Sequence, residues 1–133
     1  MRYVDDLNMY PMPEARIVVP LTLESVTEPV PAVVDTAAPW CIFEPVVAKA
    51  VVRHFLPLQS RVALSTRLGL IHGSLYRGLV VIPADEGDPL EVEATAFLSP
   101  DWRGSNFIGY QGLLQRIRFA VDPETNLFYF GQI

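Results

Sequence analysis

Short runs of apolar residues separated by turn-forming residues mark much of the chain, and one run alternates between polar and apolar positions, the pattern of a strand with one buried face. Residues 91–96 alternate without interruption. Residues 117–121 and 127–130 flank the turn-forming segment 122–126, and this arrangement predicts a closing hairpin. Further strands are predicted where β-branched and large apolar residues cluster, at 17–19, 21–23, 32–34 and 67–82. Pro20 interrupts the first cluster and favours an edge or bent strand there.

One segment has a helical period instead. Pro45 begins it, with Lys49 and Arg53 on the polar side, and Pro57 is expected to end it. The apolar residues predicted to share one face of this helix are Val46, Val47, Ala50, Val51 and Phe55. A second, shorter helix is predicted at 112–115. The pattern as a whole therefore predicts a mainly β fold, a barrel or sandwich with one or two short helices.

The domain organisation is simple. Residues 1–15, which include Pro11 and Pro13, have no clear period and are interpreted as a loose N-terminal arm. Residues 16–133 are interpreted as one domain, since the full length of 133 residues has room for one. We find no repeats and no low-complexity tracts.

Composition narrows the partners and the compartment. The net charge is −5 and the ten basic residues are scattered, which argues against a nucleic-acid partner. No apolar run approaches the ~18 residues of a membrane span, and the N-terminus lacks a signal-peptide pattern. Cys41 is the single cysteine, so no intrachain disulfide can form, and we expect a cytoplasmic protein. Because half the residues are hydrophobic and 19% are charged, part of the apolar excess is expected in a subunit interface.

Two short segments carry the candidate chemistry. Asp35 directly follows the apolar strand ending at Val34 and precedes the small residues 36–38, which places a carboxylate on a tight loop anchored by a strand. About seventy residues later, Phe107 and Ile108 end at Gly109. Taken alone, Asp35 would be interpreted as an ordinary turn aspartate, because aspartate favours turns and caps.

Together the two segments resemble the retropepsin-like (retroviral-type) aspartic protease family. Its catalytic loop reads apolar-apolar-Asp-Thr/Ser-Gly-Ala, and a later apolar-apolar-Gly strand threads beneath that loop. The resemblance covers about residues 17–131 and is closer to the longer cellular and bacterial members than to the viral ones. It implies an acid-protease half-barrel, which is one lobe of the complete enzyme.

The resemblance also implies site residues. Asp35 matches the catalytic aspartate, and Thr36 matches the hydroxyl that grips the partner loop across the dimer axis. Phe107, Ile108 and Gly109 match the second motif. The residues that correspond to substrate-binding positions of the loop and of a flap hairpin are Ala37, Ala38, Leu68, Gly69, Leu70, Ile71, His72 and Gly73.

The implied reaction requires two copies of the chain. Peptide hydrolysis by this route holds a water between two carboxyl groups, one ionised and one protonated, and two neighbouring carboxyl groups cannot both ionise. One chain offers one suitable aspartate, so the second must be Asp35 of another protomer in a two-fold dimer. The expected function is a homodimeric aspartic endopeptidase that acts on a peptide or protein substrate, without metal or cofactor.

The chain departs from the family pattern in two places. Ala37 stands where the family has glycine, which motivates an alternative function, a catalytically silent dimerisation or peptide-binding module on the same scaffold. Pro39 and Tyr110 stand where viral members have an acidic residue and an arginine that form a buried pair. A third, weaker alternative is an unrelated β-barrel binding protein.

Other chemistry-bearing residues favour structural interpretations. Cys41 with His54 or His72 suggests a thiol protease, but no third orienting residue is spaced suggestively, so Cys41 is interpreted as a small buried hydrophobe. Trp40 and Trp102 fit either a substrate cleft or, more often for large aromatics, a core. For Gly69 and Gly73, turn glycines that break a strand are nearly as good an interpretation as a mobile flap. The acidic residues of 85–88 lack the spacing of a calcium loop.

Overall fold

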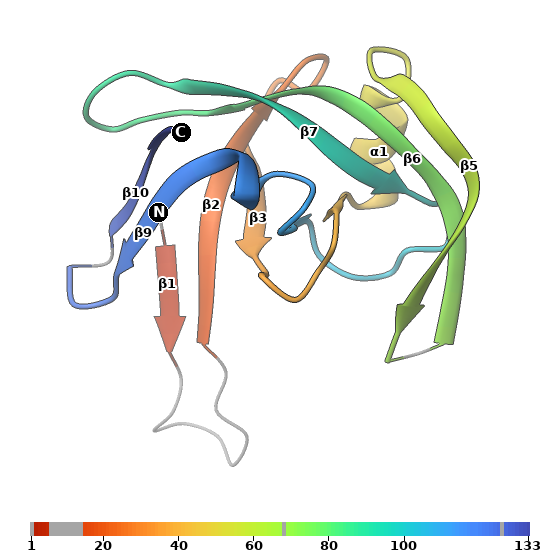
Figure 1. Cartoon of the computed structure of the whole chain (residues 1–133), viewed down its shortest axis with the longest axis horizontal. Helices are drawn as coiled ribbons and strands as arrows, with labels where there is room; N and C mark the ends of the chain where they lie inside the picture. The colour runs from red at the N-terminus through yellow and green to blue at the C-terminus, as the bar shows by residue number, and fades with distance from the viewer. Residues whose placement is uncertain (1, 6–14, 68, 126) are drawn as a thin grey trace.

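A computed structural model gives the fold and describes residues 2–5, 15–67, 69–125 and 127–133 (Figure 1). The strands are β1 (Arg2–Asp5), β2 (Ala15–Leu23), β3 (Val30–Val34), β4 (Cys41–Ile42), β5 (Leu56–Thr66), β6 (Gly69–Ile82), β7 (Leu90–Leu98), β8 (Phe107–Ile108), β9 (Ile117–Asp122) and β10 (Leu127–Gln132). One α-helix, α1, spans Pro45–Val51, and a 3-10 helix, η1, spans Leu114–Arg116. The prediction of a mainly β fold is confirmed.

The main sheet closes on itself. Its strand order is β1-β2-β3-β8-β4-β7-β6-β5, and β2 also pairs with β6, so that six of the eight strands form a barrel. The last two strands, β9 and β10, form a separate antiparallel pair. Within β7 the even-numbered residues from Leu90 to Leu98 are buried, whereas Glu91 and Glu93 are exposed, as the alternation predicts.

Strand β2 serves three neighbours in turn. Its first part pairs with β1, its middle with β3 and its last two residues with β6. Pro20 lies opposite Pro31 of β3, at the stretch where β2 has left β1 and not yet reached β6. A residue without an N–H group fits there, because no ladder bond is required on the outer side. The interpretation of Pro20 as an edge residue fits this position.

The predicted helix is real but shorter than expected. It ends at Val51, and its buried residues are Val47, Ala48 and Val51, whereas Val46 is 73% exposed. The predicted boundary at Pro57 is wrong, because Pro57 lies in the edge strand β5. This strand escaped prediction because its first six residues are all exposed and alternation begins only at Val62. An edge strand with two register shifts has little one-sided burial to reveal it.

Three further predictions concern the short helix at 112–115, the closing hairpin and the N-terminal arm. The short helix predicted at 112–115 takes the form of η1 after a turn. The closing hairpin is present, and Asp122 is the last residue of β9. In the turn that follows, a hydrogen bond with the Thr125 side chain lowers the pKa of the Asp122 carboxyl. Most of the predicted N-terminal arm lies outside the described residues, and its described residues, 2–5 and 15, lie in the paired strands β1 and β2.

The core consists of two clusters of buried residues. The larger one fills the barrel and the space beneath α1. The smaller one, which we call the hairpin cluster, joins the β5–β6 hairpin to the rest of the barrel. It consists of Ile42, Val62, Leu64, Leu75 and Phe97, with Trp40, Ile71, Trp102 and Phe107 packed against it.

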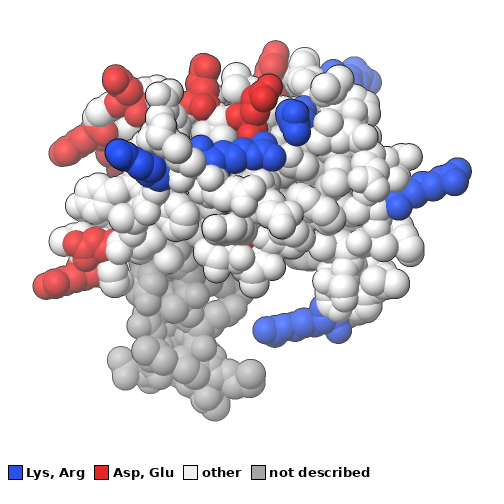
Figure 2. All heavy atoms as spheres, in the orientation of Figure 1, with Lys and Arg blue, Asp and Glu red and all other residues white. Residues whose placement is uncertain are grey.

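Charged residues are unevenly spread over the surface. Figure 2 shows one face, on which carboxylates gather at the upper left, a few basic side chains lie near one another in the upper middle and the others stand apart towards the right. Within the described part of the chain, no helix has the length and apolarity needed to cross a membrane.

Candidate functional site

Asp35 leaves the end of β3 and begins a tight loop. Its backbone N–H donates to the carbonyl oxygen of Ile108 at 3.0 Å, and its carboxylate oxygen Oδ1 accepts the N–H of Ala37 at 2.9 Å. The side chain is half-exposed and lies within 4.0 Å of no cationic group among the described residues. The loop therefore presents a solvent-accessible carboxylate whose orientation is set by the backbone that follows it.

The two segments singled out in the sequence lie side by side. Strand β3 pairs in parallel with β8, with Val33 opposite Phe107 and Val34 opposite Ile108. Strand β4, which follows the Asp35 loop, then pairs antiparallel with β8 and parallel with β7. As a result, β8 is inserted between the strand that enters the loop and the strand that leaves it.

Glycine permits the close approach of the second segment to the loop. A Cβ atom on Gly109 would lie 2.1 Å from the carbonyl oxygen of Trp40, and one on Gly112 would lie 2.7 Å from the backbone nitrogen of Cys41. Backbone bonds complete the contact, since Tyr110 N–H donates to Ala38 and Gly112 N–H donates to Pro39, at 2.7 and 2.9 Å. The loop is thus held from below by the chain that follows β8.

Asn106 braces the same region with its side chain. It is 4% exposed, its Oδ1 accepts the N–H of Glu44 at 2.8 Å, and its Nδ2 donates to Pro31 at 3.2 Å. The residue therefore ties β3 to the start of α1, on both sides of the Asp35 loop. Sequence analysis assigned no role to Asn106, and its position beside the Phe107 motif was the only signal in the sequence.

Ala37 fits the loop without backbone strain. Ser25 and Arg61 are the non-glycine residues with positive φ among those described, so Ala37 does not adopt a conformation that favours glycine. Ala37 and Thr36 are both exposed, and the Thr36 side chain makes no hydrogen bond with another described residue. In a single chain, therefore, the Ala37 methyl group is exposed, and the Thr36 hydroxyl has no hydrogen-bond partner among the described residues.

The predicted flap segment forms the β5–β6 hairpin, and Leu68 lies outside the described residues. Gly69 starts β6 with φ +114°, where glycine is required. Leu70 and His72 are exposed. Gly73 lies inside β6 opposite Val62, and its Cβ would meet Leu98 O at 2.5 Å, so the residue allows close packing and does not break the strand.

Aromatic side chains fill the space between the hairpin and the Asp35 loop. Trp40 stacks on Phe97 with 6.2 Å between the ring centroids, and Trp102 contacts Phe107 edge-on with 5.8 Å between the ring centroids. Both tryptophans are half-exposed and pack against the hairpin cluster, as does Ile71 of the hairpin. The hairpin and the loop therefore share an apolar support, and the tryptophans belong to it while keeping one side accessible.

Cys41 offers no nucleophile. It is fully buried, and burial raises the pKa of its thiol to about 11 despite the opposing hydrogen bond from the Gly109 backbone and the charge of Arg116. The thiol is therefore protonated at neutral pH. The interpretation of Cys41 as a small buried hydrophobe is confirmed. Across the described ranges, no group of three or more potential metal ligands is found.

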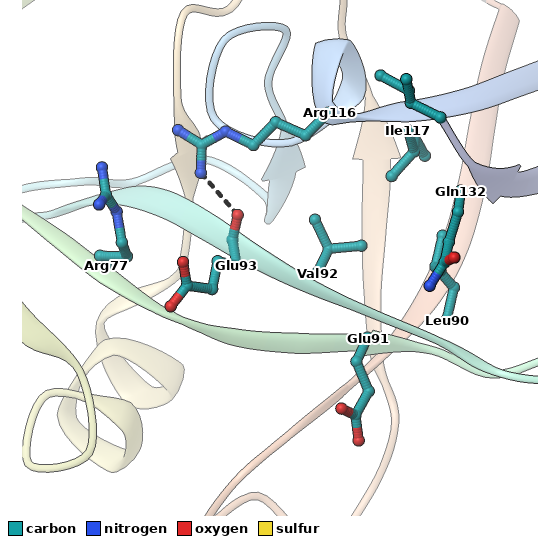
Figure 3. A pocket seen from close by; sticks show the side chains of 9 residues that line it. Arg77, Leu90, Glu91, Val92, Glu93, Arg116, Ile117 and Gln132 are labelled. Atoms are coloured by element: carbon teal, nitrogen blue, oxygen red, sulfur yellow. Dashed lines mark hydrogen bonds between the residues drawn. The ribbon is translucent and has the colours of Figure 1, made fainter.

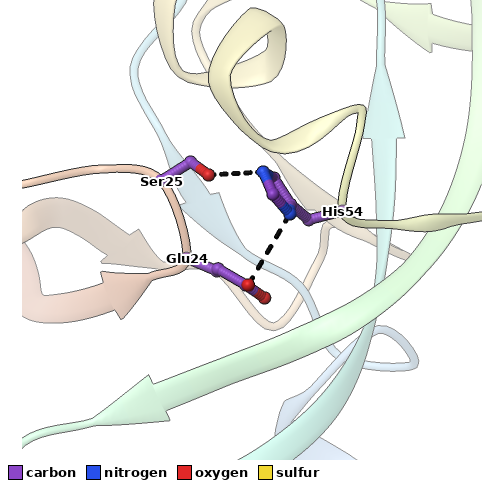
Figure 4. A network of polar contacts seen from close by, with 3 residues as sticks. All are labelled: Glu24, Ser25 and His54. Atoms are coloured by element: carbon purple, nitrogen blue, oxygen red, sulfur yellow. Dashed lines mark hydrogen bonds and ion pairs between the residues drawn. The ribbon is translucent and has the colours of Figure 1, made fainter.

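A second polar network lies on the surface (Figure 4). The Ser25 hydroxyl and His54 Nε2 are 2.5 Å apart, and His54 Nδ1 lies 3.6 Å from a carboxylate oxygen of Glu24. The residue types are those of a serine-histidine-acid triad. All three residues are exposed, however, and the Glu24 side chain is 71% exposed. We interpret the network as a clamp between the turn after β2 and the chain after α1.

Two cavities of the described structure are large enough to hold a small ligand or a short peptide segment, and Asp35 lines neither of them. One, of about 560 Å³, lies beside β7 and the end of β10. The other, of about 310 Å³, lies between α1 and the base of the β5–β6 hairpin and includes Gly73. The Asp35 loop lies outside both cavities, and its residues Thr36 and Ala37 are exposed in a single chain.

A scan of the chain against protein-family models finds no match, and a search of curated proteins finds none either. What the site can do is therefore inferred from its own residues and their geometry.

Proposed function

We propose that this chain is one lobe of a retropepsin-like aspartic endopeptidase that is active as a homodimer. The observation that carries the proposal is the parallel pairing of β3 with β8, which sets Asp35 above the Phe107-Ile108-Gly109 segment. The resemblance in sequence predicted that the second segment would thread beneath the first. A turn aspartate without a catalytic role would not require this arrangement.

The reaction follows from pairing two such loops. An ionised Asp35 takes a proton from a water molecule, whose oxygen attacks the carbonyl carbon of the peptide bond, while the protonated Asp35 of the partner subunit donates to the carbonyl oxygen. The tetrahedral intermediate then collapses, the C–N bond breaks, and the amine leaves with a proton. Because two adjacent carboxyl groups share one proton, the pair supplies both acid and base.

Features of the single chain suit this pairing. The Thr36 hydroxyl is exposed and makes no side-chain hydrogen bond within the described chain, so it is available to a second loop. The backbone bonds from Tyr110 to Ala38 and from Gly112 to Pro39 hold together the two segments that viral members join with a buried ion pair. In this proposal the β5–β6 hairpin covers an extended substrate.

The substitution Asp35→Asn tests the assignment. It keeps the size of the side chain and an oxygen that can accept the Ala37 N–H, so the fold and the dimer are expected to persist. Cleavage of an unfolded protein substrate should fall by at least about 10³-fold, because the general base is lost. Asp101→Asn, on an exposed residue away from the loop, is the matched control. Cleavage by Asp35→Asn at the rate of the control would refute the role of Asp35.

A silent dimerisation or peptide-binding module is the second candidate, and the alanine at 37 is the feature that favours it. The variant Ala37→Gly separates the two. If only the methyl group blocks catalysis where two loops meet, Ala37→Gly gains peptidase activity over an inactive wild-type protein. If the wild-type protein is active and Ala37→Gly matches it, the methyl group is harmless, as its unstrained and exposed position in one chain suggests. If neither cleaves while the dimer forms, the silent module is favoured.

A further inference from the structure

The larger cavity lies away from the Asp35 loop and shares no residue with it. It is bounded by β7 on one side and by the end of β10 and the start of β9 on the other (Figure 3). Its volume is about 560 Å³. Its lining includes two basic side chains, those of Arg77 on β6 and Arg116 at the end of η1.

In the described part of the chain, the backbone of β7 has an unpaired edge at this cavity. The strand pairs with β6 along its whole length, but on its other edge it pairs with β4 only at Ala96 and Phe97. The Thr95 N–H donates to the carbonyl of Gly112 at 2.9 Å, and the Glu93 carbonyl accepts Nη1 of Arg116 at 2.6 Å, so these groups point away from β6. Because alternate residues of a strand face the same edge, the N–H groups of Glu91 and Glu93 and the carbonyl of Glu91 also face the cavity.

A free edge of this kind is a template for another strand. From Glu91 to Glu93 it offers hydrogen bonds to about three residues of extended chain, at ~3.4 Å per residue. It is closed at one end, because Gly112 occupies the position beside Thr95 and Arg116 occupies the carbonyl of Glu93. We call the space along the β7 edge from Glu91 to Glu93 the slot. A strand added in the slot must therefore end where it meets Arg116.

The charge at the closed end selects which terminus of a strand can stop there. The guanidinium of Arg116 donates to two neutral acceptors, the Glu93 carbonyl and Thr95 Oγ1, the latter at 3.0 Å. Among the described residues, neither Arg116 nor Arg77 has a carboxylate within 4.0 Å. A guanidinium has five N–H donors, so Arg116 retains three, in an orientation that its existing bonds fix. In Figure 3 the Glu91 side chain points away from both arginines, whereas the Glu93 carboxylate points from β7 towards the Arg77 side of the cavity.

We propose that this slot binds the C-terminal end of an extended peptide, added as a strand parallel to β7, with its terminal carboxylate held by Arg116 and Arg77. A peptide amine at the same place would be repelled by the two positive charges. The parallel direction follows because β7 runs from the open end of the slot, near Leu90, to the closed end. The site is separate from Asp35, and peptide binding there does not require the proposed peptidase activity.

Fluorescence anisotropy tests the proposal on the full-length chain carrying Asp35→Asn, which prevents cleavage of the probe. The probe is an N-terminally fluorescein-labelled peptide of sequence Ser-Thr-Val-Thr-Val with a free C-terminal carboxylate, compared with the same peptide as a C-terminal amide. The free acid is expected to bind about tenfold more tightly, a preference that weakens with added salt. Equal affinity for acid and amide, or no saturable binding up to about 1 mM, overturns the proposal.

Two variants separate the charge from the strand edge. Arg77→Gln, on an exposed side chain, should reduce the preference for the acid by several-fold while leaving the amide unaffected. Glu91→Pro removes an N–H that faces the slot and not β6, so it should weaken both peptides, whereas Glu91→Ala should bind both as the parent does. If Glu91→Pro does not fold, the Arg77→Gln comparison still decides. An unchanged acid preference in Arg77→Gln removes that residue from the site, and the proposal in its stated form fails.

Discussion

The Asp35 loop and the β5–β6 hairpin, which we assign to opposite sides of one peptide site, are built in different ways. The loop at 35–40 is short, yet its backbone is bonded to residues 108, 110 and 112. The hairpin is long, with an edge strand of 11 residues and two register shifts, and its large side chains Leu56 and Leu70 are exposed. Its outer part, before β6 meets β7 at Ser74, is anchored by Val62, Leu64 and Ile71 in the hairpin cluster and by the Ser99 hydroxyl, which donates to the His72 carbonyl at 2.6 Å.

The difference indicates that two tasks fall to different parts of the fold, namely holding a carboxylate in place and opening to admit a substrate. A catalytic carboxylate must be held in place by groups that are themselves fixed, and the Asp35 loop meets this condition through backbone contacts. A segment that admits substrate belongs to the part of a structure that opens at low free-energy cost, and the outer hairpin has few buried contacts. Perturbations of the loop should therefore cost far more than equal perturbations of the hairpin tip.

The largest effect is expected from Gly109→Ala. The new methyl group would lie 2.1 Å from the Trp40 carbonyl oxygen and 2.3 Å from its carbon, and these are backbone atoms that cannot rotate away. We expect the free energy of unfolding in urea to fall by about 3 kcal/mol or more. Peptidase activity should fall with it, because Ile108, the preceding residue, accepts the Asp35 N–H.

Gly131→Ala is the control for this substitution. Gly131 lies in β10, and its Cβ would meet nothing within 4 Å. Its stability should change by less than about 0.5 kcal/mol. Similar losses in both variants would show that the Asp35 loop tolerates displacement and that the contrast between the two regions is wrong.

A second test uses the proton on Cys41, which lies directly behind the loop. In the unfolded chain the thiol titrates near 9.0, whereas burial raises its pKa to about 11 in the fold. The folded state thus retains a proton that the unfolded state loses, so this contribution to stability is full below pH 9 and is lost as the pH rises towards 11. Two pH units correspond to roughly 2–3 kcal/mol.

The measurement is urea denaturation at pH 8 and pH 11 for the wild-type chain and for Cys41→Ala. Other groups titrate in this range in both proteins, so the difference between their pH dependences reports Cys41. The stability advantage of the wild-type chain should shrink as the pH rises. A difference that is constant with pH, or rapid reaction of the native thiol with a disulfide reagent at pH 8, would mean that the region behind the loop opens readily.

Local burial determined which parts of the fold could be predicted. Residues 91–96 were found because one-sided burial leaves a period of two in the sequence, and the pair β9–β10 was found because two apolar runs flank the turn-forming segment 122–126. Strand β5 was missed because it is exposed over its first six residues, and the end of α1 was misplaced because Pro57 serves an edge strand. The sequence shows that Pro57 cannot continue a helix, but it does not show that α1 ends six residues earlier or that Val46 faces solvent, because both depend on tertiary packing.

The site shows the same division. The family resemblance implied that the segment 107–109 would thread beneath the Asp35 loop, and in the structure the Asp35 N–H donates to the Ile108 carbonyl. The support for that contact was not predictable, because Asn106 and Gly112 act through backbone groups far away in the sequence. A buried asparagine or glycine is identified as a brace only once its neighbours are known.

The smallest effect is expected at the tip of the hairpin, from Gly69→Ala. Gly69 has φ +114°, and its Cβ would meet nothing within 4 Å, so alanine is opposed by backbone strain alone. We expect a loss of about 1–2 kcal/mol in urea denaturation, and less if the turn relaxes locally. Leu70→Ala, on a side chain that is 66% exposed, is the control and should change stability by less than about 0.5 kcal/mol. A loss in Gly69→Ala that equals that of Gly109→Ala would show that the tip unfolds together with the Asp35 loop, so that the hairpin could not open independently of the site that we propose it covers.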